Sequence, residues 1–112
     1  MPLRPHPTGW EADRAARLAV VHADNKAALA EIVALAAPTG DPVTDIILAR
    51  LADKARRWLG AIERTERTPF LSPTGEDDLG HWGENGRAPA IRQMLASARF
   101  HAASARGVRD AA

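Results

Sequence analysis

The chain of 112 residues contains no cysteine and no tyrosine, and only two of its 15 basic residues are lysine. The absence of cysteine excludes disulfides, thiol catalysis and cysteine-ligated zinc, and the absence of tyrosine excludes a phenolic general acid. The 15 basic and 14 acidic residues leave a net charge of +1. Because this charge is close to zero, any nucleic-acid surface must come from local segregation of charge.

Large apolar side chains are also scarce. Hydrophobic residues make up 46% of the chain, but 24 of them are alanine. Alanine lets helices approach closely and buries little area per residue, so we expect one small domain of marginal stability that gains from a partner or from self-association. A composition rich in alanine and arginine and poor in lysine is typical of GC-rich bacterial genomes and their phages.

The sequence lacks long apolar runs as well. No segment approaches the ~20 residues that a transmembrane helix requires. The N-terminal residues include three prolines and no apolar stretch of the kind found in a secretory signal. These features predict a cytoplasmic protein without a membrane partner.

The periodicity predicts an all-α fold. After an extended proline-rich leader over residues 1–9, a long antiparallel helical hairpin is expected over residues 10–67. Thr8 and Glu11 form a capping box at the start of its first helix. Apolar residues then recur at heptad spacing, with Asn25 in the missing position: Leu18, Val21, Ala28, Ile32 and Leu35.

Turn residues predict where this hairpin reverses. Gly40 suits a helix end, and Asp41 followed by Pro42 predicts an N-cap with proline in the first turn of the second helix. Thr68-Pro69 should stop that helix at Arg67. Residues 68–88 are expected to form a long irregular loop that is rich in glycine, proline and acidic residues. Beyond it we expect a basic third helix over 89–106, giving a three-helix, bundle-like fold, and a frayed C-terminus over 107–112.

Two polar residues interrupt the first helix. Asn25 sits where a heptad favours leucine, which indicates either a buried amide that pairs across a helix interface or a position that reaches solvent. His22 lies nearby and could join Asn25 in one polar layer, although a lone histidine on a helix is more often satisfied or exposed than functional.

The second helix carries four basic residues on one face, and this row has two interpretations. Arg50, Lys54, Arg57 and Arg64 follow one another at spacings of 4, 3 and 7. Such a row suits phosphate tracking, but Asp53–Arg57 and Glu63–Arg67 are favourable i, i+4 pairs. We therefore favour a solvated surface with local ion pairs. Gly60 in the same helix indicates either a close backbone approach or a bend near Trp58.

Basic residues dominate the C-terminal segment, where no acidic residue lies between Asn85 and Arg109. Two interpretations are equally supported: contact with nucleic acid, or docking on an acidic surface, such as the preceding loop with Glu76, Asp77, Asp78 and Glu84. The candidate contact residues are Arg87, Arg92, Arg99, Arg106 and Arg109.

The glycine-rich segment before the third helix, residues 80–86, weakly resembles an anion cradle and is better explained as a flexible turn. Its neighbours Asp77, Asp78, His81 and Glu84 lack the spacing of a zinc or calcium site. No nucleophile, base and orienting residue fall in a recognisable pattern, so neither catalytic residues nor cofactors are expected.

These observations favour a non-enzymatic helical interaction protein that acts within an oligomer or a larger assembly, with a possible origin in a phage or mobile element. A small nucleic-acid-binding regulator is the alternative, and a subunit of an enzyme with a site between helices is the next. Large aromatics outside the heptad positions, together with the unusual asparagine, are the candidate interface anchors: Trp10, Asn25, Phe70, Trp82 and Phe100.

Overall fold

The computed structural model describes residues 9–111, without the side chains of Arg106 and of residues 108–111. It contains the helices α1 (Gly9–Leu35), α2 (Pro42–Arg67), α3 (Asp78–Trp82) and α4 (Ala88–Ala111). The described residues include no strand, and the predicted all-α class is confirmed. The expected leader, apart from Gly9, lies outside the described residues, as does Thr8 of the expected capping box.

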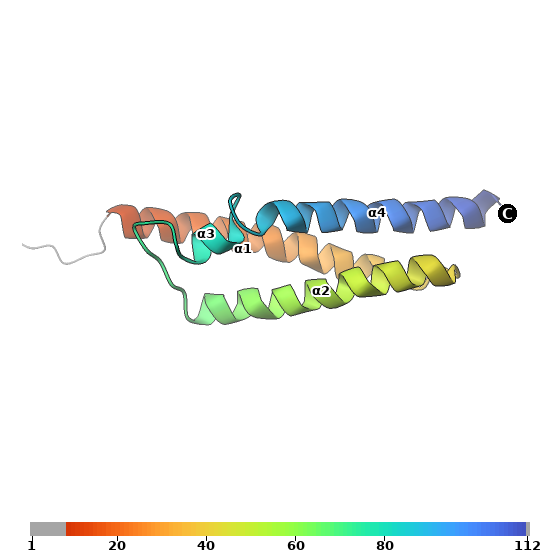
Figure 1. Ribbon diagram of the computed structural model, residues 1–112, viewed down its shortest axis with the longest axis horizontal. Helices are drawn as coiled ribbons and strands as arrows, with labels where there is room; N and C mark the ends of the chain where they lie inside the picture. Colours follow the sequence, from red (N-terminus) through yellow and green to blue (C-terminus); the bar gives the residue numbers. More distant parts are fainter. Residues whose placement is uncertain (1–8, 112) are drawn as a thin grey trace, which may run out of the picture.

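The three long helices form an elongated assembly (Figure 1). Helix α2 runs antiparallel to α1, and α4 returns in the direction of α1 (Figure 1). These three helices contact one another pairwise, while the short α3 packs on α1. The segment that leads from α2 to α4 therefore has to travel back along the N-terminal half of α1.

The turn between α1 and α2 is fixed by local polar contacts. Helix α1 ends at Leu35, whereas the run without glycine or proline up to Pro38 predicts an end at Ala37. Asp41 caps α2 by accepting a hydrogen bond from the backbone N–H of Thr44 at 3.1 Å, and Pro42 occupies the first turn, as predicted. Asp45 accepts hydrogen bonds from both the backbone N–H and the hydroxyl of Thr39, at 2.8 and 2.7 Å. Gly40 has a positive φ of 92°, but it lies within the turn and not at the end of the helix.

The core uses one face of each long helix, and alanine lines much of it. In α1 the buried residues include His22 and Leu29, which replace Val21 and Ala28 of the predicted face. In α2 and α4 the buried face includes Ala52, Ala55, Ala98 and Ala102. The largest buried side chain is Trp82, which comes from α3 and not from a long helix. It supplies bulk that the alanine-lined faces lack.

The segment predicted to be an irregular loop over 68–88 is more ordered than expected, because it contains α3. The helix begins where Asp77 caps it. It could not be predicted from the sequence, because Gly80 lies within it and Gly83 follows it, and glycine disfavours helix. A Cβ on Gly80 would lie 2.1 Å from the carbonyl oxygen of Gly75, and a Cβ on Gly86 would lie 2.1 Å from that of His81. These glycines therefore permit close backbone packing. Residues 80–82 belong to α3 and not to a turn, whereas residues 83–87 do form the bend and turn that lead into α4.

The C-terminal helix differs from the prediction at its end. Helix α4 begins at Ala88, one residue early, and continues through Gly107 to Ala111. The expected end of the helix at Gly107 is wrong, because residues 107–111 are helical, and Ala112 lies outside the described residues. The expected fraying of the C-terminus stays a prediction. A single glycine inside a helix costs only about 1 kcal/mol, and no proline follows that would force an end. Within residues 9–111, no helix is both long enough and apolar enough to cross a membrane.

Gly60 provides a test of this packing. A Cβ placed there would have one neighbour within 4 Å, the guanidinium of Arg64 at 3.5 Å, so no other backbone approaches it among the described residues. We expect Gly60→Ala to stabilise the protein by about 0.5–1 kcal/mol, because alanine is the better helix former. Urea denaturation followed by circular dichroism measures the change.

Gly86→Ala is the matched control, and it should destabilise the protein because the new methyl group would clash with a carbonyl oxygen. Loss of stability in Gly60→Ala would contradict the free space that we describe around α2.

Candidate anion-binding groove

A groove of about 620 Å³ lies between the C-terminal half of α2 and the segment that contains α3. We call it the arginine groove, because guanidinium groups enter it from both sides. Helix α2 contributes Arg57, Ala61 and Arg64 at spacings of 4 and 3, which places them on one face, with Trp58 and Thr65 beside them and Thr68 directly after the helix end. The other wall consists of Asp78, His81, Trp82 and Arg87.

The two α2 arginines of the groove carry uncompensated charge. Asp53 pairs with Arg56 at 3.1 Å, so the predicted Asp53–Arg57 pair is wrong. Within residues 9–111, neither Arg57 nor Arg64 has an ion pair or a hydrogen bond from its side chain. The explanation of this row as a set of local ion pairs therefore fails at the groove.

Arg87 is held in the groove by aromatic rings. Its guanidinium carbon lies 4.5 Å from the ring centroid of Trp58 and 5.1 Å from that of Trp82. The two indoles meet edge to face, with centroids 6.2 Å apart. A guanidinium stacked on an aromatic face keeps its N–H groups available for a planar oxyanion, so Arg87 is preorganised for carboxylate or phosphate.

The groove contains one carboxylate among its described lining residues, that of Asp78. Its Oδ2 already accepts a hydrogen bond from the backbone N–H of Phe70 at 2.7 Å. Three guanidiniums therefore face a single, partly satisfied negative charge. This balance makes the groove attractive to an anion.

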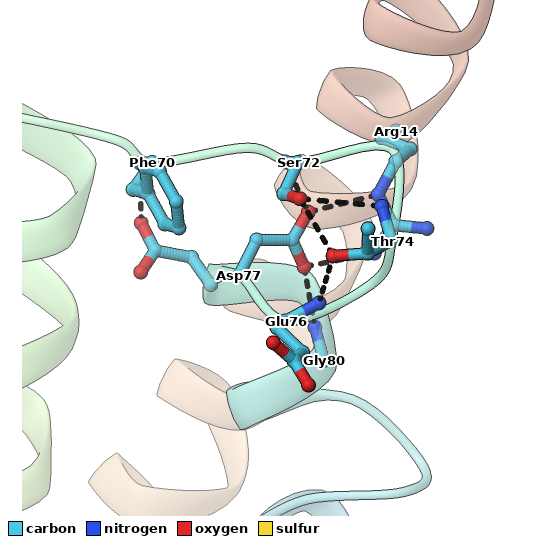
Figure 2. A network of polar contacts seen from close by, with 8 residues as sticks. Arg14, Phe70, Ser72, Thr74, Glu76, Asp77 and Gly80 are labelled. Atoms are coloured by element: carbon cyan, nitrogen blue, oxygen red, sulfur yellow. Dashed lines mark hydrogen bonds and ion pairs between the residues drawn. The ribbon is translucent and has the colours of Figure 1, made fainter.

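The wall that carries Arg87 is positioned by the buried carboxylate of Asp77 (Figure 2). Arg14 of α1 donates to both of its oxygens, at 2.9 and 2.8 Å, and the backbone N–H groups of Ser72 and Gly80 donate at 2.8 and 3.0 Å. The Arg14 guanidinium, aided by these two amides, holds the pKa of Asp77 far below its usual range. One side chain thus fixes the connecting segment to α1 and caps α3.

Trp82 and Asn25 were both expected to be interface anchors, and the structure places them in the interior of the chain. Trp82 is 1% exposed, because α3 turns its side chain into the core. Asn25 is buried, and its amide donates to the carbonyl oxygen of Trp82 at 2.9 Å. The buried-amide interpretation of Asn25 is therefore correct, but its partner lies within the same chain.

His22 is also buried. Its Nε2 lies 3.1 Å from the hydroxyl oxygen of Thr65, which also lies 2.8 Å from the carbonyl oxygen of Ile62. Its Nδ1 has no hydrogen-bond partner among the described residues. Burial lowers the pKa of His22, and the weaker influences of Glu66, Asp78 and Lys26 do not reverse this effect.

The described contact arginines of the C-terminal segment, Arg87, Arg92 and Arg99, have different surroundings. Arg92 pairs with both carboxylate oxygens of Glu84, at 2.7 and 2.8 Å, as the acidic-loop interpretation predicts. Arg99 pairs in the same way with Glu31 of α1, at 2.6 and 2.7 Å. Of Arg87, Arg92 and Arg99, only Arg87 lines the groove. The side chains of the other two candidates, Arg106 and Arg109, lie outside the described part of the structure.

The remaining candidate anchors are exposed and come from separate elements. Trp10 in α1 is 37% exposed, Phe70 in the connecting segment 58%, and Phe100 in α4 66%. Their role as interface anchors stays a prediction.

Chemically, the groove is suited to binding. Guanidiniums stay protonated, so they hold anions but do not transfer protons. Among the residues that the structure describes, no three histidine or carboxylate side chains gather into a metal-ligating group. The chain matches no family model, no curated protein and no solved structure. The geometry of the arginine groove is therefore the feature that points to a function.

Asp77 generates a prediction about acid stability. Because its folded pKa lies below the unfolded value of about 3.9, the contribution of Asp77 is complete above that pH and is lost as the pH falls through the folded pKa. We expect Asp77→Asn to lose about 2 kcal/mol at pH 7 and to show a shallower loss of stability between about pH 5 and pH 2. Urea titrations at several pH values measure both effects.

Asp24→Asn is the control, because Asp24 is exposed and has no hydrogen bond or ion pair among the described residues. An Asp77→Asn variant with the acid sensitivity of the wild type would contradict the role of the buried pair.

His22 should titrate below the usual histidine value of about 6.5, because protonation would place an N–H without an acceptor in the core. The unfolded chain binds this proton first, so stability should fall as the pH is lowered below about 6.5. Two-dimensional NMR of the imidazole protons gives the midpoint directly. A midpoint at or above 6.5 would contradict the lowered pKa of His22.

Proposed function

We propose that this chain is a helical interaction protein without catalytic chemistry of its own, which binds an anionic partner in the arginine groove. The observation that carries the proposal is the convergence of Arg57, Arg64 and Arg87 around one groove that holds a single carboxylate. This function keeps the interaction role expected from the sequence and assigns a charge to the partner.

The arginines of the groove are available to an external anion, whereas other arginines of the chain are already paired. Arg92 and Arg99 already have carboxylate partners, so an external anion would have to displace Glu84 or Glu31. Arg57 and Arg64 have no such partner within residues 9–111, and Arg87 is oriented by two indoles. An anion in the groove therefore meets groups that need little rearrangement before they form charge-assisted hydrogen bonds.

Assembly through apolar surface has weaker support. The large apolar side chains that are exposed belong to different elements, including Val20 in α1, Val43 and Ile46 in α2, and Phe100 in α4. Exposed apolar residues that occur singly are normal on soluble proteins.

The test uses heparin as a generic polyanion, titrated at low salt and followed by tryptophan fluorescence. We expect binding that weakens as salt increases, and about tenfold weaker binding for the double variant Arg57→Ala/Arg64→Ala, because two of the three groove charges are lost.

Arg56→Ala is the matched control. Arg56 precedes Arg57 in the chain, but it pairs with Asp53 and does not line the groove. Its removal should leave heparin binding within about twofold of the wild type, since exposed ion pairs contribute little. Equal losses in the control and the double variant, or no heparin binding at all, would refute the proposed function.

A further inference from the structure

We propose that the anionic partner is single-stranded nucleic acid, whose backbone follows the basic row of α2 while a base contacts the Trp58–Arg87 pair. This inference rests on the proposed function and adds the chemical class of the ligand.

The positive charges of α2 are arranged in a line. Arg50, Lys54, Arg57 and Arg64 share one face of α2, and the 14 residue steps from Arg50 to Arg64 span about 21 Å. Among the described side chains, none of these four takes part in an ion pair. A compact anion can use only one end of such a row. A chain with a negative charge at each repeat can use all of it.

Trp58 provides an aromatic surface near the centre of this basic row. Trp58 is partly exposed in the groove, with Lys54 Nζ 4.9 Å and the Arg87 guanidinium 4.5 Å from its ring centroid. Indole rings and guanidinium planes are both surfaces on which unpaired bases stack. A groove with a cationic row and an aromatic centre combines the two features that sequence-tolerant single-strand binding requires.

Single-stranded nucleic acid fits the groove better than a duplex or an acidic peptide does. Bases in a duplex are stacked on one another, so their faces are not available to an indole in the lining of the groove. An acidic peptide could satisfy the arginines, but it has no base to place on Trp58 or Arg87. Single-stranded nucleic acid uses both the charges and the aromatic surface.

The experiment measures fluorescence anisotropy of a labelled 12-nucleotide single strand of mixed sequence, with the full chain, at several salt concentrations. Phosphate contacts with Arg50, Lys54, Arg57 and Arg64 predict a slope of about −3 for log K against log salt, and replacement of any one of them by alanine should reduce its magnitude by about 0.7. Polyglutamate of matched charge and the same oligonucleotide annealed to its complement are the competing ligands. Each should bind at least fivefold more weakly than the single strand.

Trp58 distinguishes stacking from charge alone. Trp58→Leu should weaken single-strand binding about tenfold and polyglutamate binding no more than about threefold, because Arg87 keeps its contact with Trp82 and polyglutamate has no base to stack. Trp58→Phe should recover most of the loss in single-strand binding because it keeps an aromatic face. Arg56→Ala should bind the single strand as the wild type does.

The outcomes separate the two proposals. Heparin binding without oligonucleotide binding overturns this inference and leaves the proposed function intact. Equal or tighter binding of polyglutamate or duplex also overturns it, as does wild-type single-strand affinity in a folded Trp58→Leu variant. Absence of binding to heparin and to the oligonucleotide refutes both proposals.

Discussion

The buried carboxylate of Asp77 is the interaction on which the connecting segment depends. It joins Arg14 of α1 to the amides of Ser72 and Gly80, so three parts of the chain meet at one group. Removal of a carboxylate from water is costly unless its oxygens are satisfied, and here four donors satisfy them. The position of α3 follows from this contact. The burial of Trp82 and the stacking of Arg87 on Trp58 follow in turn.

The core compensates for its alanine content through this segment. Ala52, Ala55, Ala98 and Ala102 let the long helices approach closely but supply little apolar area. Trp82 adds a large buried surface, and the amide of Asn25 satisfies the carbonyl oxygen that accompanies it into the interior. Glycines at 80 and 86 permit the tight path of the backbone that this arrangement requires. A segment that reads as a loop is therefore part of the hydrophobic core.

The long helices could be predicted because their signals are local. Asp41 and Pro42 define the start of α2, and Thr68-Pro69 its end, whatever packs against it. The groove could not be predicted, since it joins α2 to Arg87, a residue that is distant in sequence from Arg57 and is positioned only by tertiary contacts. One signal was available in the basic row of α2, which contains Arg57 and Arg64. The predicted Asp53–Arg57 pair favoured a solvated surface there, whereas the structure pairs Asp53 with Arg56.

The backbone of Arg87 gives the groove a further property. Its N–H donates to the carbonyl oxygen of His81 at 2.9 Å while its side chain stacks on Trp58, so one residue closes the connecting segment and completes the groove. Local opening of residues 69–87 would therefore remove the wall that carries Arg87 and leave only the α2 side of the groove. The free energy of this opening contributes directly to ligand affinity, and any ligand that occupies the groove protects the segment from hydrogen exchange. Affinity and local folding are thus two measurements of one equilibrium.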